Sequence, residues 1–166
     1  MKVINLGQTD SILNKFVSQL RDTKVQKDSM RFRRNLERIG EIFGYEISKG
    51  LNYSAKEFTT PLGIATIPTY DDKVVVATVL RAGLPLPQGI LNYFDDAQNA
   101  FVAAYRKYDK GEDFHINIEY ITTPDLTGKV LILADTMLAT GASLEIAYKK
   151  LCEQGEPAHT HLVCPI

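Results

Sequence analysis

The feature that most constrains the fold of this chain is a set of short, almost wholly apolar runs. Three of them span Val74 to Leu80, Ala100 to Tyr105 and Lys129 to Ala134. Nearly continuous apolar runs are typical of strands that are covered on both faces, as in a parallel sheet. Segments with helical spacing follow the first and third runs, so the sequence predicts an α/β fold with a doubly wound, mostly parallel sheet.

Two further strands and two helices complete this predicted core. Ile116 to Ile121 alternates polar and apolar residues, which predicts a strand near an edge. His159 to Ile166 predicts the last strand. One helix is expected to run through Ile90 to Phe94, and a second, ended by Gly155, is expected to have Leu144, Ala147, Tyr148 and Leu151 on one face.

Two amphipathic helices are predicted ahead of the sheet. Asp10 is expected to cap a short helix whose apolar face carries Ile12, Leu13, Phe16, Val17 and Leu20. A long helix is expected from about Ser29 to Lys49, stopped at Gly50. Basic residues outnumber acidic ones from Arg21 to Arg38. We interpret this run as a solvated helix face, and the alternative is that one of its arginines reaches an anionic ligand.

The segment from Phe58 to Ile67 differs from both patterns. Two β-rich runs flank Pro61-Leu62-Gly63, which predicts a β-hairpin or arm. We therefore expect a single domain over residues 1–166, with N-terminal helices at about 10–50, a β-arm at about 56–68 and an α/β core at about 73–166. Because the chain stops within an apolar strand, we expect this core to continue past Ile166.

Composition excludes several classes of protein. The net charge of −1 argues against a broadly basic, nucleic-acid-binding surface. No apolar run approaches the roughly 20 residues that span a bilayer, and the N-terminus lacks the apolar core of a signal peptide. Cys152 and Cys164 make no disulfide framework. A cytoplasmic protein without membrane or nucleic-acid partners is expected.

The strongest functional motif is the segment from Asp135 to Ser143. A buried strand delivers Asp135, a loop of small residues follows, and a helix then begins. Amides at the start of that helix, with the hydroxyls of Thr140 and Ser143, would make a cradle for a phosphate monoester. Asp135 would accept hydrogen bonds from sugar hydroxyls. The alternative is an ordinary strand-to-helix turn in which Asp135 or Ser143 caps the helix.

Two arginines follow the other predicted strands. Arg81 comes directly after a buried strand, where it is well placed for a pyrophosphate oxygen. Arg106 begins a polar loop that would fold over a ligand and exclude water. A surface arginine and a solvated loop are the alternatives at these two places.

These residues together resemble a known family. The segment Asp135 to Ser143, Asp-Thr-Met-Leu-Ala-Thr-Gly-Ala-Ser, is similar to the phosphoribosyl diphosphate (PRPP) motif of the uracil phosphoribosyltransferases. Four other segments also resemble parts of that family, and they occur in one order along the chain. They are Phe32-Arg33, Thr60-Pro61-Leu62-Gly63, Leu80-Arg81-Ala82-Gly83-Leu84 and Tyr105-Arg106. Departures from the family pattern include Thr136, Ala142 and Pro85-Leu86-Pro87, the lack of an acidic run after Arg106, and the lack of the Gly-rich uracil-recognition segment.

The resemblance implies transfer of ribose 5-phosphate from PRPP to N1 of uracil, giving UMP and pyrophosphate in pyrimidine salvage. It implies catalytic roles for Asp135, Arg81 and Arg106. The expected PRPP contacts are Arg81, Arg106, Asp135, Thr136, Met137, Leu138, Ala139, Thr140, Gly141, Ala142 and Ser143. Uracil-binding residues are expected beyond Ile166. The family also implies Mg²⁺ carried by PRPP rather than by a protein metal site, and a homodimer or higher homo-oligomer.

The sequence leaves two alternative functions open. The chain could be a phosphoribosyltransferase for a purine or another pyrimidine, or a non-catalytic PRPP-binding regulator such as an RNA-binding relative. A zinc site at His159, His161 and Cys164 is not favoured. On a strand the two histidines share a face and the cysteine points the other way, and a fourth ligand is not evident.

Overall fold

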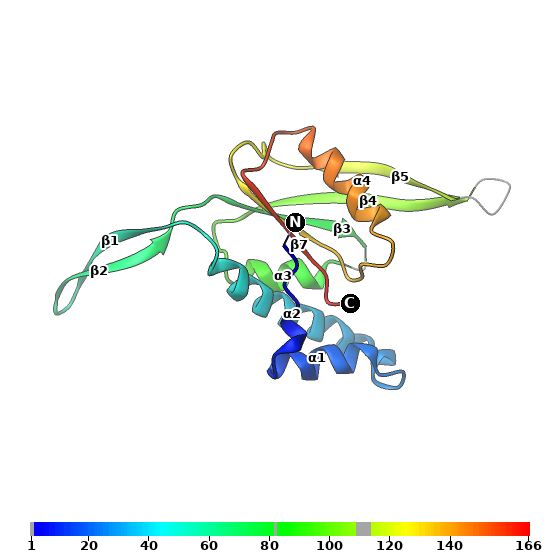
Figure 1. Ribbon diagram of the computed structural model, residues 1–166, viewed down its shortest axis with the longest axis horizontal. Coiled ribbons are helices and arrows are strands. Elements are labelled where there is room, and N and C mark those ends of the chain that lie inside the picture. The colour runs from blue at the N-terminus through cyan, green and yellow to red at the C-terminus, as the bar shows by residue number, and fades with distance from the viewer. Residues whose placement is uncertain (1, 82, 109–113) are drawn as a thin grey trace.

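The computed structural model has a five-stranded sheet at its centre (Figure 1). It describes residues 2–81, 83–108 and 114–166, without the side chains of residues 105–118. The strand order is β5-β4-β3-β6-β7, and only β5 is antiparallel to its neighbour. The predicted α/β fold with a mostly parallel sheet is confirmed. The strands are β3 (Val74–Leu80), β4 (Gln98–Tyr108), β5 (Phe114–Thr122), β6 (Val130–Ala134) and β7 (His159–Val163).

Helices cover both faces of this sheet, which is why its central strands are so apolar. They are α1 (Ile12–Arg21), α2 (Ser29–Ser48), α3 (Pro85–Leu91) and α4 (Ala142–Cys152). Val74 and Val76 of β3 belong to the cluster that includes side chains of α1, α2 and α3. Val75 and Ala77 belong to the cluster that includes side chains of α4. Alternate residues of one strand are therefore buried on opposite faces, as the strand period of two requires.

Three local predictions need correction. Ser11, not Asp10, caps α1, because the helix begins at Ile12 and the Ser11 hydroxyl accepts a hydrogen bond from the Leu13 amide at 3.3 Å. α3 ends at Leu91, and Phe94 is buried in the turn beyond it. Tyr148 of α4 is exposed, since the buried face of that helix runs through Leu144, Ala147 and Leu151.

α2 and α3 cross at two glycines. A Cβ at Gly40 would overlap the carbonyl oxygen of Leu86, and a Cβ at Gly89 would overlap that of Glu37. The two main chains are therefore in direct contact. Because α3 begins just after Arg81, this crossing fixes the position of the turn that follows β3. No helix among the described residues is long and apolar enough to cross a membrane.

The arm is a separate two-stranded antiparallel sheet that projects from the body (Figure 1). Its strands are β1 (Tyr53–Thr60) and β2 (Gly63–Tyr70), so it is longer than the predicted segment. The ring of Tyr70 contacts both Tyr53 and the buried Phe94 edge to face, which joins the arm to the core.

Candidate functional site

The predicted site residues follow parallel strands and so meet at one edge of the sheet. Thr78 of β3 pairs with Ala134 of β6, and Leu80 pairs with Ala103 of β4. Arg81 therefore leaves β3 beside the end of β6, where Asp135 follows. Arg106 lies within β4, three residues beyond Ala103 toward the same edge, and it pairs with Ile116 of β5, so the prediction that it begins a loop is wrong. Its side chain is outside the described residues.

The loop between β6 and α4 has an open helix end. Gly141 occupies the N-cap position with φ of +78°, a left-handed conformation that favours glycine, and as a glycine it has no side chain with which to cap α4. The alternative in which Asp135 or Ser143 caps the helix is therefore wrong. The uncapped N-terminus leaves a partial positive charge and free amides at the end of the loop.

Several amides of this loop are available to a ligand. Among the residues that the structure describes, the N–H groups of Ala139, Thr140 and Gly141 donate no hydrogen bond. The Ala142 amide has only the Thr140 hydroxyl, at 3.4 Å. Adjacent free amides at a helix N-terminus suit the oxygens of a phosphate group.

Asp135 lies at the other end of the loop and is half-buried. One of its carboxylate oxygens accepts a hydrogen bond from the Thr136 amide at 2.7 Å. Burial raises the pKa of Asp135, while hydrogen bonds from Thr136 and from the Met137 amide act in the opposite direction. The carboxylate is thus held by its own loop and retains acceptor capacity for hydroxyl groups.

The turn after β3 packs closely on the sheet. A Cβ at Gly83 would lie 2.8 Å from the carbonyl oxygen of Val79 and 3.9 Å from that of Ala134. Only glycine fits here without a shift, so the turn that carries the exposed Arg81 lies against the end of β6. The peptide bond between Leu80 and Arg81 is cis.

The basic run of α2 is partly accounted for by local contacts. Arg31 pairs with Asp28, and Arg34 with Glu37. The guanidinium of Arg38 lies 5.3 Å from the ring centre of Phe16. For Arg31 and Arg34, which are exposed, the contacts support the interpretation of a solvated helix face, whereas Arg38 is partly buried against α1.

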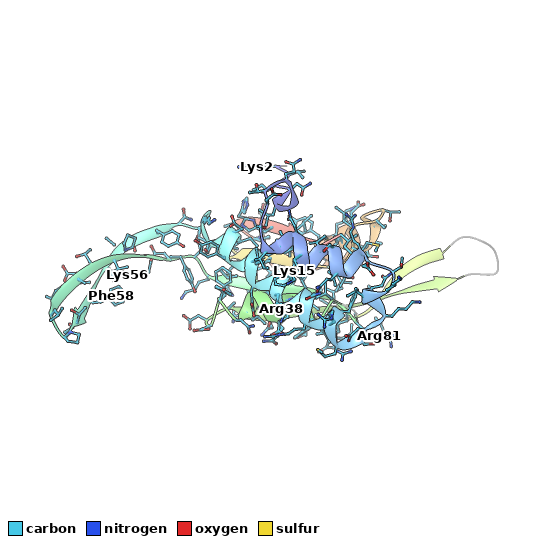
Figure 2. All side chains as sticks on the ribbon, turned by 90° about the horizontal axis from the view of Figure 1, so that it is seen from below. Lys2, Lys15, Arg38, Lys56, Phe58 and Arg81 are labelled. Carbon is cyan, nitrogen blue, oxygen red and sulfur yellow. The ribbon has the colours of Figure 1, made fainter. Side chains whose placement is uncertain are left out.

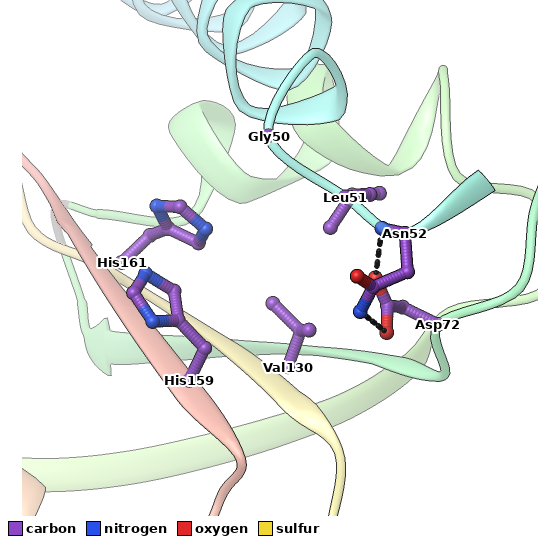
Figure 3. A pocket seen from close by; sticks show the side chains of 7 residues that line it. All are labelled: Gly50, Leu51, Asn52, Asp72, Val130, His159 and His161. Carbon is purple, nitrogen blue, oxygen red and sulfur yellow. Dashed lines mark hydrogen bonds between the residues drawn. The ribbon is translucent and has the colours of Figure 1, made fainter.

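A hollow of about 210 Å³ lies elsewhere, at the root of the arm (Figure 3). Its lining includes Val130 and His159, the first residues of β6 and β7, so it lies at the amino ends of these strands, away from the Asp135 loop. The His159 and His161 rings are 4.6 Å apart between centres, and burial and the neighbouring His159 lower the pKa of His161. Across the hollow, the carboxylate of Asp72 accepts hydrogen bonds from Asn52 at 2.7 and 3.0 Å.

Cys164 packs against the α4-side core cluster, and no group of three or more His, Cys, Asp or Glu residues that could hold a metal ion occurs among the described residues.

The last residue of β7 and the residues that follow it are part of the site and were not identified from the sequence. The carbonyl of Val163 accepts a hydrogen bond from the Asp135 amide at 3.1 Å, and that of Ile166 accepts one from the Leu138 amide at 2.8 Å. The sequence pattern predicted one strand over His159 to Ile166, whereas β7 ends at Val163. Pro165 is the signal that was available, because proline has no N–H for a strand ladder.

Comparison with known proteins agrees with the geometry. A family model described as uracil phosphoribosyltransferase matches residues 8–166. A uracil phosphoribosyltransferase from Porphyromonas gingivalis is 56% identical over 162 residues, which cover 98% of this chain and 75% of that protein. Another from Methanothermobacter thermautotrophicus is 36% identical and covers 80% of this chain and 62% of its own length.

Solved structures have the same fold. The AQ2163 protein from Aquifex aeolicus superposes with a TM-score of 0.83 at 26% identity, covering 98% of this chain and 75% of that one. A hypoxanthine phosphoribosyltransferase from Staphylococcus aureus gives a TM-score of 0.55 at 12% identity over 80% of this chain and 62% of that one. At 12% identity, the likeness to the hypoxanthine phosphoribosyltransferase shows the fold alone.

Proposed function

The chain belongs to the uracil phosphoribosyltransferase family, and we propose that it makes UMP and pyrophosphate from uracil and PRPP. The observation that carries this proposal at the level of atoms is the open loop after β6. Its free amides at residues 139–141 stand at the N-terminus of α4, and the half-buried carboxylate of Asp135 lies at the other end of the same loop. The amides suit the phosphate of ribose 5-phosphate, and the carboxylate suits its hydroxyl groups.

The donor would lie across the carboxyl edge of the sheet. The amides and hydroxyls of Thr140 to Ser143 would hold the 5-phosphate, and Asp135 would accept hydrogen bonds from the ribose hydroxyls. Arg81, exposed on the turn after β3, would neutralise the pyrophosphate together with Arg106 from β4. The remaining loop residues Thr136, Met137, Leu138 and Ala139 would contact the donor through the main chain.

In the reaction, the bond between ribose C1 and the pyrophosphate oxygen breaks, and a bond from C1 to N1 of uracil forms. Pyrophosphate leaves with the bonding electrons, and N1 of uracil loses its proton. Positive charge develops on the ribose ring, so oriented donors that stabilise the leaving group and exclude water favour transfer over hydrolysis.

We infer that Mg²⁺ would arrive with PRPP. Pyrophosphate and ribose oxygens would supply most of its ligands, and the carboxylate of Asp135 is of the oxygen-ligand type that Mg²⁺ prefers. When bound, the ion would neutralise charge on pyrophosphate.

We also propose that the arm packs on a second copy of the chain. Large apolar side chains are exposed on both of its faces: Phe58 and Ile67 on one, Tyr53 and Ile64 on the other. An isolated two-stranded ribbon has no core of its own, so a partner surface would remove these side chains from water.

The decisive test is product analysis with the purified chain, PRPP, Mg²⁺ and one base at a time. Formation of UMP with uracil, and no product with hypoxanthine, guanine or orotate, supports the proposal. Product from a purine or from orotate would indicate another phosphoribosyltransferase. Binding of RNA at physiological salt without turnover would indicate a regulator, and in that case the transferase proposal fails.

A further inference from the structure

The segment formed by residues 163–166, here called the β7 extension, is bonded to the phosphate-loop candidate at two points. The Asp135 amide donates to the Val163 carbonyl at 3.1 Å, and the Leu138 amide donates to the Ile166 carbonyl at 2.8 Å. The two bonds span the first half of the loop. Its main chain is therefore tied to a neighbouring segment rather than only to its own ends.

The β7 extension is itself anchored on both faces of the sheet. The side chains of Val163 and Ile166 pack against the core cluster on the α2–α3 side. Cys164 between them packs against the cluster on the α4 side. Burial and the nearby charge of Asp135 raise the pKa of the Cys164 thiol to about 11, although a hydrogen bond with the Asp135 main chain acts in the opposite direction, so the thiol is neutral.

Pro165 determines the course of the main chain between the two carbonyls. Its ring fixes φ near −65°, so the carbonyls of Val163 and Ile166 have less freedom to move relative to each other. Glycine at this position would remove that restriction and a side chain as well. Pro165 is thus placed to control the loop without touching a ligand.

The loop has two halves: the first contains amides that donate hydrogen bonds within the protein, and the second contains amides that donate none among the described residues. The amides of Asp135, Thr136 and Leu138 are used within the protein. Those of Ala139, Thr140 and Gly141 donate no hydrogen bond among the described residues. The side chain of Leu138 also lies over Gly141, whose Cβ position is 3.6 Å from a Leu138 methyl carbon.

We propose that the β7 extension preorganises the 5-phosphate subsite, with Pro165 as a positioning residue. The inference rests on the proposed function, because it assigns the free amides to the 5-phosphate. The extension holds the first half of the loop, and this leaves the second half with its donors aligned before the ligand arrives. A preorganised site loses less conformational freedom on binding. The pyrophosphate end of the donor, held by the Arg81 turn, does not share this support.

The test compares Pro165→Gly with Pro157→Gly, the matched proline that precedes β7. Ribose 5-phosphate and pyrophosphate are titrated separately by calorimetry, and KM for PRPP and kcat are measured. For Pro165→Gly we expect about tenfold weaker ribose 5-phosphate binding, a similar rise in KM, and changes within about twofold for pyrophosphate affinity and kcat. Pro165→Ala should lie between glycine and the wild type, since alanine restricts the main chain more than glycine. Pro157→Gly should bind both ligands as the wild type does.

Hydrogen exchange gives a second readout that needs no variant. The amides of Asp135 and Leu138 should exchange more slowly than those of Ala139, Thr140 and Gly141 in the free protein. Equal exchange rates for these two groups of amides would overturn the inference. So would an equal loss of affinity for ribose 5-phosphate and for pyrophosphate in Pro165→Gly. If the wild type binds ribose 5-phosphate and Pro165→Gly binds it equally well, the inference fails and the proposed function stands. A wild type that binds no ribose 5-phosphate contradicts the proposed function first.

Discussion

Gly89 of α3 lies directly against the carbonyl oxygen of Glu37 in α2, with no room for a Cβ between the two main chains. Gly89→Ala should therefore push the helices apart and lower the free energy of unfolding by about 1–3 kcal/mol or more. Gly44→Ala on α2 is the control, because its Cβ would make ordinary contacts at 3.5 Å. Urea unfolding of both variants measures the difference. Equal free energies of unfolding for the two variants would show that the α2–α3 crossing accommodates a Cβ at Gly89.

Asp135 should oppose folding at neutral pH. Its pKa is raised above the ordinary value of 3.8 because burial penalises the charged form. The protonated form is therefore favoured in the folded state, and that advantage is lost as the pH rises through the folded pKa. Asp135→Asn should melt at a higher temperature than the wild type at pH 7, with little difference below the ordinary carboxyl range, and should turn over more slowly.

Asp125→Asn is the matched control for that measurement. Hydrogen bonds from the Thr127 amide and hydroxyl lower the pKa of Asp125, so its charge stabilises the folded state above the ordinary value and the benefit is lost as the pH falls. This variant should melt at a lower temperature than the wild type at pH 7. Melting curves that move in the same direction for both variants would contradict the assignment at Asp135.

Arg81→Ala should weaken the binding of PRPP more than the binding of UMP. UMP has no pyrophosphate, so its affinity should change little. PRPP should lose a charge-assisted contact of roughly 1.5–3 kcal/mol, or about 10- to 150-fold in Kd. Lys56→Ala serves as the control cation, since Lys56 lies on the arm at the other end of the molecule (Figure 2). An equal loss for UMP and PRPP would assign Arg81 to the fold alone.

The arm is tested by changing one apolar face. Phe58→Ser with Ile67→Ser removes the large side chains of that face and keeps the hairpin residues Pro61 and Gly63. In sedimentation velocity at micromolar concentration, we expect the wild type to be a dimer and the double variant to shift toward monomer. Thr59→Ser is the control. A wild type that sediments only as a monomer would remove the proposal of arm-mediated assembly.

The fold was predictable where one physical rule dominates. β3 begins and ends at the predicted residues, because an unbroken apolar run suits a strand buried on both faces. α2 ends one residue from the predicted end, since its apolar spacing is long and regular. The cap of α1 was misassigned because Asp10 and Ser11 are both good capping residues, and local sequence alone does not choose between them.

The site was predictable in part. The positions of Arg81 and Asp135 at one edge follow from the rule that parallel strands end together. The hydrogen bond from Leu138 to Ile166 was not predictable, because it lies beyond the end of β7 and joins main-chain atoms that every residue has. Side-chain chemistry is visible in a sequence, whereas a main-chain contact depends on the completed fold.

The arm and the loop lie at opposite edges of the sheet. The arm leaves the body beside the first residues of β6 and β7, whereas the loop follows their last residues (Figure 1). The length of strands β6 and β7 therefore separates the root of the arm from the loop. Under the proposed arm-mediated assembly, the arm tip at Pro61–Gly63 can be lengthened, shortened or substituted to change which copies of the chain pair, while the residues of the loop stay the same.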